Sequence, residues 1–92
     1  MRISYDEEKR LKVLNDRQID FDDAAELFKA FHLTRRDDRP YDEERYISIG
    51  EIRGQVILVV WTPREDSRRI ITMWKADHGE REKFYRRRDR SG

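Results

Sequence analysis

Three short apolar runs in the second half of the chain constrain its fold more than any other feature. They read RYISIG at residues 45–50, QVILVVWT at 55–62 and RRIITMWK at 68–75, and they are rich in Val, Ile and Thr, which favour strands. Glycines separate the first two runs, and the segment PREDS separates the last two. Connections this short join antiparallel neighbours, so we expect an antiparallel meander. Its middle run is apolar on both faces and is expected to be the central strand.

Two helices are expected before this sheet. The first begins at Asp6, where acids precede bases and Leu11 and Leu14 form the apolar pair. The second lies in IDFDDAAELFKAFHL, residues 19–33, with Asp20 as its N-cap and His32 at its end. Its apolar residues recur at helical spacing: Phe21, Ala24, Ala25, Phe28 and Phe31. Residues 34–44 mix both charges without an apolar period and predict a mobile loop.

The C-terminal segment predicts a third helix. Asp77 and Glu80 have capping-box spacing, and Phe84 is the apolar residue that can pack on the sheet. A short strand at residues 2–5 and a flexible basic tail at 86–92 complete the chain. We therefore expect one α+β domain over residues 1–92, with an antiparallel sheet of three to four strands, two N-terminal helices and one C-terminal helix.

Composition and charge exclude several classes of function. The chain has no cysteine, which excludes disulfides and thiolate metal sites, and its longest apolar run is too short to span a membrane. A cytoplasmic protein without a membrane partner is expected. Residues 63–92 carry ten Lys and Arg against six Asp and Glu, whereas the two preceding thirds are slightly acidic. The basic C-terminal third is a candidate surface for a polyanion such as RNA.

Motifs for the common enzyme classes are absent from the sequence. It contains no phosphate-binding P-loop, no dinucleotide-binding glycine motif and no nucleophile elbow. The two histidines are far apart and no Asp, Glu and His residues have metal-ligand spacing, so no metal or cofactor is expected.

Basic residues of the predicted meander are the remaining candidates for chemistry. Arg45, Arg64, Arg69 and Lys75 lie at strand ends and turns, and we expect them to converge on one patch. Guanidinium groups form paired hydrogen bonds with phosphate oxygens and stabilise negative charge in a transition state. RNA supplies its own nucleophile, the 2′-hydroxyl, so a metal-free ribonuclease needs only to bind, orient and transfer protons. The expected catalytic residues are Arg64, Arg69, Lys75, Glu80 and His78, and the expected RNA-binding residues are Arg45, Arg53 and Arg81.

The same residues also have structural explanations. Arginines on a sheet are typical of a solvated face in a chain that is 45% charged. Glu80 is explained by the capping box alone, and His78 by its place at the start of a helix. Trp61 and Trp74 fit a core or a partner contact as well as a surface on which bases stack. A binding module without catalysis is therefore the alternative to an enzyme.

Nearly the whole chain, from Tyr5 to Tyr85, resembles the BrnT-type toxins of bacterial type II toxin–antitoxin systems. The similarity rests on the order and spacing of several segments: Tyr5-Asp6 with Lys9, FDDAAELF at 21–28, EERYISIG at 43–50, ILVVWTPR at 57–64 and RRIITMWKADHGEREKFY at 68–85. The resemblance implies a RelE-like fold and an endoribonuclease that arrests translation. It also implies a cognate BrnA-like antitoxin, which dimerises, binds operator DNA and neutralises the toxin.

The polar residues of the family motif can be placed on this chain position by position. They fall on Arg45, Thr62, Arg64, Arg69, Lys75, Glu80 and Arg81. The chain departs from the family pattern at two places. Asp16-Arg17-Gln18 stands where family members commonly have Lys-His-Gly, and Trp74 stands where an arginine often follows the third strand. Replacing glycine by Gln18 implies a differently shaped connection between the first two helices.

Overall fold

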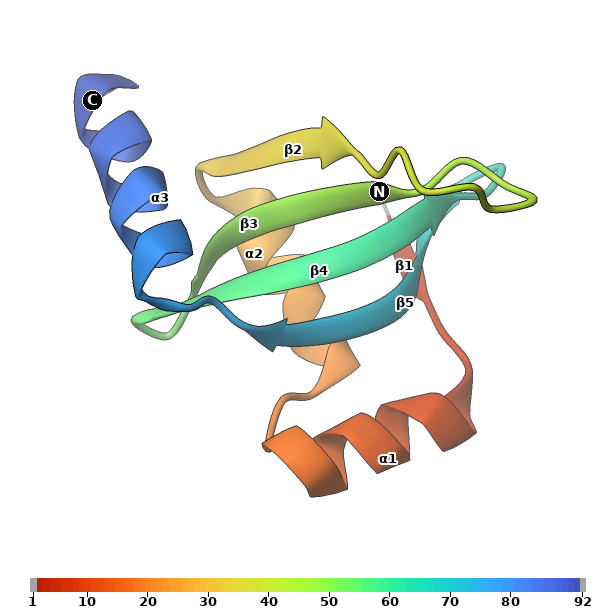
Figure 1. The fold of residues 1–92 in the computed structure, drawn as a ribbon. Helices are drawn as coiled ribbons and strands as arrows, with labels where there is room; N and C mark the ends of the chain where they lie inside the picture. The colour runs from red at the N-terminus through yellow and green to blue at the C-terminus, as the bar shows by residue number, and fades with distance from the viewer. Residues whose placement is uncertain (1, 92) are drawn as a thin grey trace.

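A five-stranded mixed sheet organises the molecule in the computed structural model, which describes residues 2–91 (Figure 1). The strand order is β1-β5-β4-β3-β2, with β1 parallel to β5 and all other neighbours antiparallel. Along the chain the elements are β1 (Arg2–Ser4), α1 (Glu7–Arg17), the 3-10 helix η1 (Phe21–Asp23), α2 (Ala24–Lys29), β2 (His32–Arg36), β3 (Tyr46–Ile52), β4 (Gln55–Pro63), β5 (Ser67–Lys75) and α3 (His78–Ser91).

The predicted meander is confirmed as β3, β4 and β5. β4 is the central strand, and all its residues from Val56 to Val60 are buried, as expected for a strand covered on both sides. The bulge on β5 opposite Val60 and Trp61 shifts the register near the strand's middle. The α+β class is thus correct.

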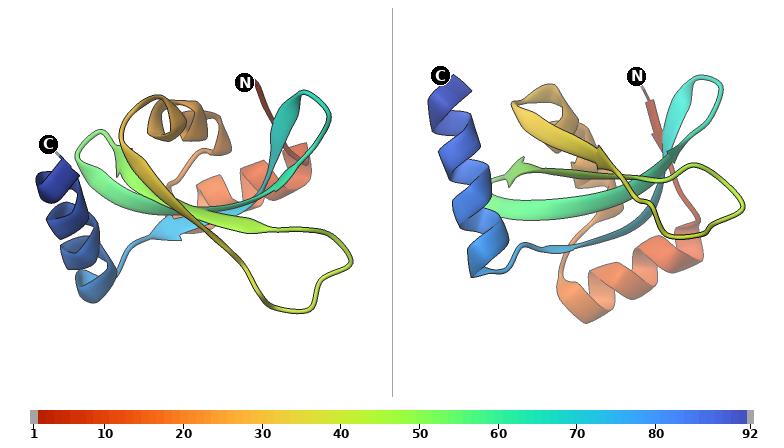
Figure 2. Two further views of the ribbon diagram at one scale, coloured as in Figure 1. Left: turned by 90° about the horizontal axis from the view of Figure 1, so that it is seen from above. Right: turned by 45° about the horizontal axis from the view of Figure 1, so that its top comes forward.

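The two faces of the sheet differ in how they are covered. One face, called here the helix-covered face, packs on α1, η1 and α2, and its core includes Phe21, Leu27, Val59 and Met73. The other, called the open face, carries a smaller apolar cluster of Ile47, Leu58 and Val60, with α3 at one end (Figure 2). The open face is the part of the sheet that an external molecule can approach.

The predicted number and direction of strands were wrong in detail. The expected short N-terminal strand is present, but it pairs parallel with β5 and makes the sheet mixed. Residues 34–36, which were predicted to be part of a loop at 34–44, belong to β2, and this strand pairs antiparallel with β3. β2 reads HLTRR and lies at the edge of the sheet, so it needs no run of apolar residues and leaves a weak sequence signal.

The N-terminal helices are present with different packing from that expected. In α1 the buried residue is Val13, whereas Leu11 is 52% exposed. The second helix is split into η1 and the six-residue α2, and Asp20 caps η1 as predicted by accepting a hydrogen bond from the Asp22 amide. Phe31, which was expected on the apolar face of this helix, lies beyond α2 and is exposed. Leu27 is buried in the core instead. His32 begins β2 instead of ending the helix.

The third helix begins as predicted. The Glu80 amide donates to Asp77 Oδ1 at 2.8 Å and the Asp77 amide donates to Glu80 Oε1 at 2.9 Å, which completes a capping box. Phe84 is 1% exposed and anchors the helix. Of the tail expected at 86–92, residues 86–91 continue α3, while Gly92 lies outside the described residues. Within residues 2–91, no helix has the length and apolar character needed to cross a bilayer.

Candidate functional site

The sheet separates the predicted site residues into two groups. Arg69 pairs with Thr62 at the start of β5, whereas Lys75 pairs with Ile57 at its end. Six residues of extended chain place these two side chains about 20 Å apart. The expected convergence of Lys75 with the three arginines is therefore wrong, because the meander runs from one end of the sheet to the other.

The first group, called here the arginine end, lies where the 37–45 loop meets the β4–β5 turn, away from α3 (Figure 1). Glu43 is its centre. One of its carboxylate oxygens lies 3.6 Å from Arg45 Nη2 and the other lies 3.3 Å from Arg64 Nη1. The Arg45 guanidinium lies 3.8 Å from the centre of the Tyr41 ring, and its buried Nε has no hydrogen-bond partner. Stacking on Tyr41 thus positions Arg45 while leaving part of its donor capacity unused.

Arg69 belongs to the same end of the sheet. It lies between Thr62 of β4 and Ser4 of β1, and strand alternation places it on the open face with Thr62. Thr62 is 1% exposed. Within residues 2–91, Arg69 has no carboxylate within ion-pair distance. Its charge is available to a phosphate.

The second group lies at the α3 end of the sheet. His78 is 77% exposed, with Nε2 3.8 Å from Glu82 and Nδ1 3.4 Å from Arg81 Nη2. Glu80 Oε1 accepts the capping hydrogen bond described above. Lys75 and Arg81 line a shallow hollow beside the β3–β4 turn. This group contains two exposed cations, Lys75 and Arg81, beside acidic side chains, at the opposite end of the sheet from Arg64 and Arg69.

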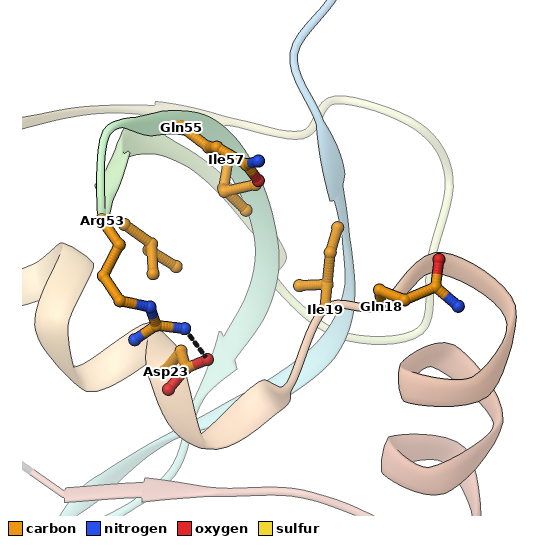
Figure 3. A pocket seen from close by; sticks show the side chains of 7 residues that line it. Gln18, Ile19, Asp23, Arg53, Gln55 and Ile57 are labelled. Carbon is orange, nitrogen blue, oxygen red and sulfur yellow. Dashed lines mark hydrogen bonds and ion pairs between the residues drawn. The ribbon is translucent and has the colours of Figure 1, made fainter.

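Arg53 belongs to neither group. It occupies the β3–β4 turn with φ of 47° and forms ion pairs with Asp23 at 2.7 Å and Glu26 at 3.3 Å. Figure 3 shows the Arg53–Asp23 ion pair at the edge of a pocket next to the connection between α1 and η1. The volume of this pocket is about 270 Å³. Two carboxylates on the same chain compensate the charge of Arg53, so its geometry indicates a structural role in joining the turn to α2.

Sequence reasoning missed residues that the structure places near the arginine end. Glu43 and Tyr41 lie in the loop, and their spacing of two and four residues before Arg45 was the signal available. Arg68 stacks against the rings of Phe28, at 4.2 Å, and Trp61, at 5.0 Å, on the helix-covered face. Its buried Nε also lacks a hydrogen-bond partner.

The loop that carries Glu43 is ordered by a buried carboxylate. Asp37 is 5% exposed, and the Arg39 guanidinium donates to both of its oxygens, at 2.9 and 2.7 Å. This hydrogen-bonded pairing with Arg39 lowers the pKa of Asp37 below its ordinary value, so the carboxylate stays ionised near neutral pH. The Asp37 amide also donates to the Arg45 carbonyl, which joins the two ends of the loop.

Comparison with known proteins places these residues in a family. A family model described as "Ribonuclease toxin, BrnT, of type II toxin-antitoxin system" matches residues 5–80, which include both groups of predicted site residues apart from Arg81. A search among curated proteins found no match. The matched region covers most of the chain, from the residue after β1 to the first turn of α3. The chain therefore belongs to the BrnT family of ribonuclease toxins of type II toxin–antitoxin systems.

Proposed function

We propose that the protein is an endoribonuclease toxin that cleaves RNA without a metal ion and thereby inhibits translation. The observation that carries the proposal is the arginine end: Arg45 and Arg64 flank Glu43, and Arg69 lies at the same end of the sheet, with no carboxylate at ion-pair distance among residues 2–91. The Glu43 carboxylate supplies a proton acceptor, and the arginines around it supply ligands for a phosphate.

The arginines are assigned to binding and charge stabilisation. Arg69 binds the scissile phosphate first, since it has no internal ion pair to break. Arg64 Nη1 is 3.3 Å from Glu43 and 45% exposed, so it can turn toward a phosphate at little cost. Arg45, held by Tyr41, positions the substrate. Together they stabilise the additional negative charge of the pentacovalent transition state.

Glu43 is assigned to proton transfer. Its carboxylate accepts the proton of the RNA 2′-hydroxyl, whose oxygen attacks the neighbouring phosphorus. The bond between phosphorus and the 5′-oxygen breaks, and that oxygen is protonated from solvent. The products are a 2′,3′-cyclic phosphate and a 5′-hydroxyl end. Glu80 and His78 were the candidates for proton transfer predicted from the sequence, and they lie at the α3 end of the sheet with Lys75 and Arg81. Lys75 and Arg81 are assigned to binding phosphates farther along the RNA.

The experiment is cleavage of a defined RNA by the purified protein in the presence of EDTA. Wild-type protein is expected to produce cyclic phosphate ends, and Arg64→Ala and Arg69→Ala are each expected to lower the rate by at least about a hundredfold. Arg90→Ala, at the far end of α3, is the control for loss of one positive charge. RNA that stays intact with wild-type protein in EDTA, together with normal growth after induced expression in bacteria, would overturn the proposal.

One observation favours the alternative, a non-catalytic module that binds RNA or an antitoxin. Glu43 already pairs with two of the three arginines, as expected if these charges only stabilise the loop. Glu43→Gln separates the two functions, because it removes the proton acceptor while releasing both arginines. If the protein is a ribonuclease, the wild type cleaves RNA and Glu43→Gln loses cleavage while it keeps or gains RNA affinity. If the protein is a binding module, neither the wild type nor the variant cleaves, and the variant binds RNA more tightly.

The family's type II system gives the chain a protein antitoxin as its partner. We propose a BrnA-like antitoxin that dimerises, binds operator DNA and neutralises the toxin in the cytoplasm. The gene beside the toxin gene is expected to encode it. Because the acids of the antitoxin would pair with exposed cations of the toxin, the complex is expected to weaken as salt concentration rises. A complex that is insensitive to salt would contradict this electrostatic picture.

A further inference from the structure

A groove separates α3 from the open face of the sheet. Its volume is about 480 Å³. The floor is aliphatic and comes from β2, β3 and β4: Leu33, Ile47, Ile49 and Leu58. Phe84 of α3 forms the wall. None of the roles assigned above to the arginine end uses this groove.

Unpaired positive charges surround the groove. Arg35 of β2 and Lys83 and Arg87 of α3 line its rim, and all three are exposed. Within the described chain, none of them has a carboxylate at ion-pair distance, although Arg88 on the same helix pairs with Glu51 and Asp89. The single acidic residue of the lining, Glu80, is held by its capping hydrogen bond. The groove therefore complements a ligand with apolar side chains flanked by negative charges.

The floor favours a protein segment over RNA. Nucleobases bind proteins by stacking on exposed aromatic faces or planar guanidinium groups. Phe84 is 1% exposed and contacts the rings of Phe31 and Tyr85, so it offers no free face. The four floor residues have branched aliphatic side chains, which pack well against Leu, Ile or Val of another protein.

We propose that this groove, called the α3 groove, binds an acidic segment of the antitoxin whose aliphatic side chains enter it. The inference rests on the proposed toxin function and names the surface through which the partner acts. Through Arg35 and Ile47 the groove continues into a second hollow lined by Trp74 and the start of the 37–45 loop. The lining of this hollow includes Asp37 and Asp38, so the acidic part of the segment stays in the groove and an uncharged continuation occupies the hollow. Such a segment covers the open face and blocks the approach of RNA to Arg69.

The test uses the purified toxin and the antitoxin encoded beside it, with affinity measured by calorimetry at low and high salt. Two matched pairs of variants separate the groove from general effects. Arg87→Glu changes a rim charge, while Arg86→Glu makes the same change one residue away, outside the groove. Leu33→Asp places a charge in the floor, while Leu11→Asp does so at a leucine that is exposed on α1.

Arg87→Glu and Leu33→Asp are expected to weaken antitoxin binding about tenfold to a hundredfold, with little change in the two controls. Arg87 is exposed, so its variant tests the groove even if Leu33→Asp fails to fold. Equal affinities of Arg87→Glu and Arg86→Glu, or a wild-type toxin that does not bind this antitoxin, would overturn the inference. A groove variant that no longer binds RNA but still binds the antitoxin would also overturn the inference. Absence of RNA cleavage by wild type, with antitoxin binding still lost in the groove variants, would refute only the enzyme.

Discussion

Gly50 allows β2 and α2 to lie close to β3, and replacing it with alanine tests how tightly this part of the core is packed. A β-carbon added at Gly50 would lie 2.8 Å from Leu27 Cγ and 3.2 Å from Leu27 Cδ2. Carbon atoms pack best at about 3.5–4.0 Å. Leu27 is fully buried, so it cannot move away without displacing its neighbours in the core.

The expected magnitude combines two opposing effects. Overpacking of a dense core costs about 1–3 kcal/mol. Alanine recovers about 0.5–1 kcal/mol relative to glycine within a strand, because the unfolded chain has less freedom to lose. We therefore expect Gly50→Ala to lower the free energy of unfolding by about 1–2 kcal/mol. Leu27→Ala removes the two Leu27 atoms and by itself costs about 2–5 kcal/mol. In that background the added β-carbon still lies 3.2 Å from His32 Cβ, so Gly50→Ala is expected to cost less than in the wild type.

A double-mutant cycle measured by urea unfolding at constant pH checks this reasoning. The coupling between the two substitutions is expected to be about 1–3 kcal/mol in the favourable direction, with an unchanged m-value. Gly54→Ala is the control, since no atom lies within 4 Å of its added β-carbon and only its φ of 82° opposes the change. Its cost should be the same with Leu27 or Ala at position 27. An equal cost of Gly50→Ala in both backgrounds would refute the packing argument.

Two further predictions concern the N-terminal helices. Gln18 ends α1 in the left-handed conformation, with φ of 57°, so Gln18→Gly is expected to raise the free energy of unfolding by up to about 1 kcal/mol. Gln18→Ala keeps the backbone strain and loses the hydrogen bond to the Asn15 carbonyl, so it should lower the free energy of unfolding. A higher thermal stability of the alanine variant than of the glycine variant would contradict this. Asp20 accepts hydrogen bonds from Arg10, which lower the pKa of Asp20 below its ordinary value of 3.8. A lowered pKa in the folded state stabilises the protein above that ordinary pKa, and the contribution is lost as pH falls through the folded-state value. Asp20→Asn keeps a capping side chain, so its destabilisation in urea should be clear at pH 7 and should fade as the pH falls below the ordinary pKa of 3.8. A difference that persists undiminished at low pH would argue against the ion pair.

The elements predicted correctly from the sequence are those whose apolar or capping pattern matches the burial and hydrogen bonds of the folded protein. The β3–β5 meander has apolar runs that are buried in the structure, and Asp77 and Glu80 cap a helix by contacts within one turn. β2 was missed because an edge strand has a neighbour on one side only and tolerates a polar sequence. Phe31 was misplaced because α2 ends before it, at Lys29, and the chain then turns into β2. Periodicity alone does not reveal where a helix stops.

The candidate site was predicted in part for a similar reason. Arg45, Arg64 and Arg69 lie at the same end of three adjacent strands, which follows from a meander of short connections. Lys75 was grouped with them although it stands at the opposite end of β5. The spacing of Glu43 from Arg45 does not by itself predict that Glu43 lies next to Arg64, since this depends on how the 37–45 loop folds back.

The parallel pairing of β1 with β5 determines when the fold can be completed during synthesis. Ser4 and Ser67, whose hydroxyl oxygens lie 3.3 Å apart, are separated by 63 residues along the chain. β1 is therefore made first but has no partner until β5 has left the ribosome, and closing so long a loop is slow compared with forming the hairpins. Arg69 sits on β5 at the residue that pairs with Ser4. If Arg69 binds phosphate as proposed, a nascent or truncated chain would lack the completed site, and activity would begin only when β5 pairs with β1.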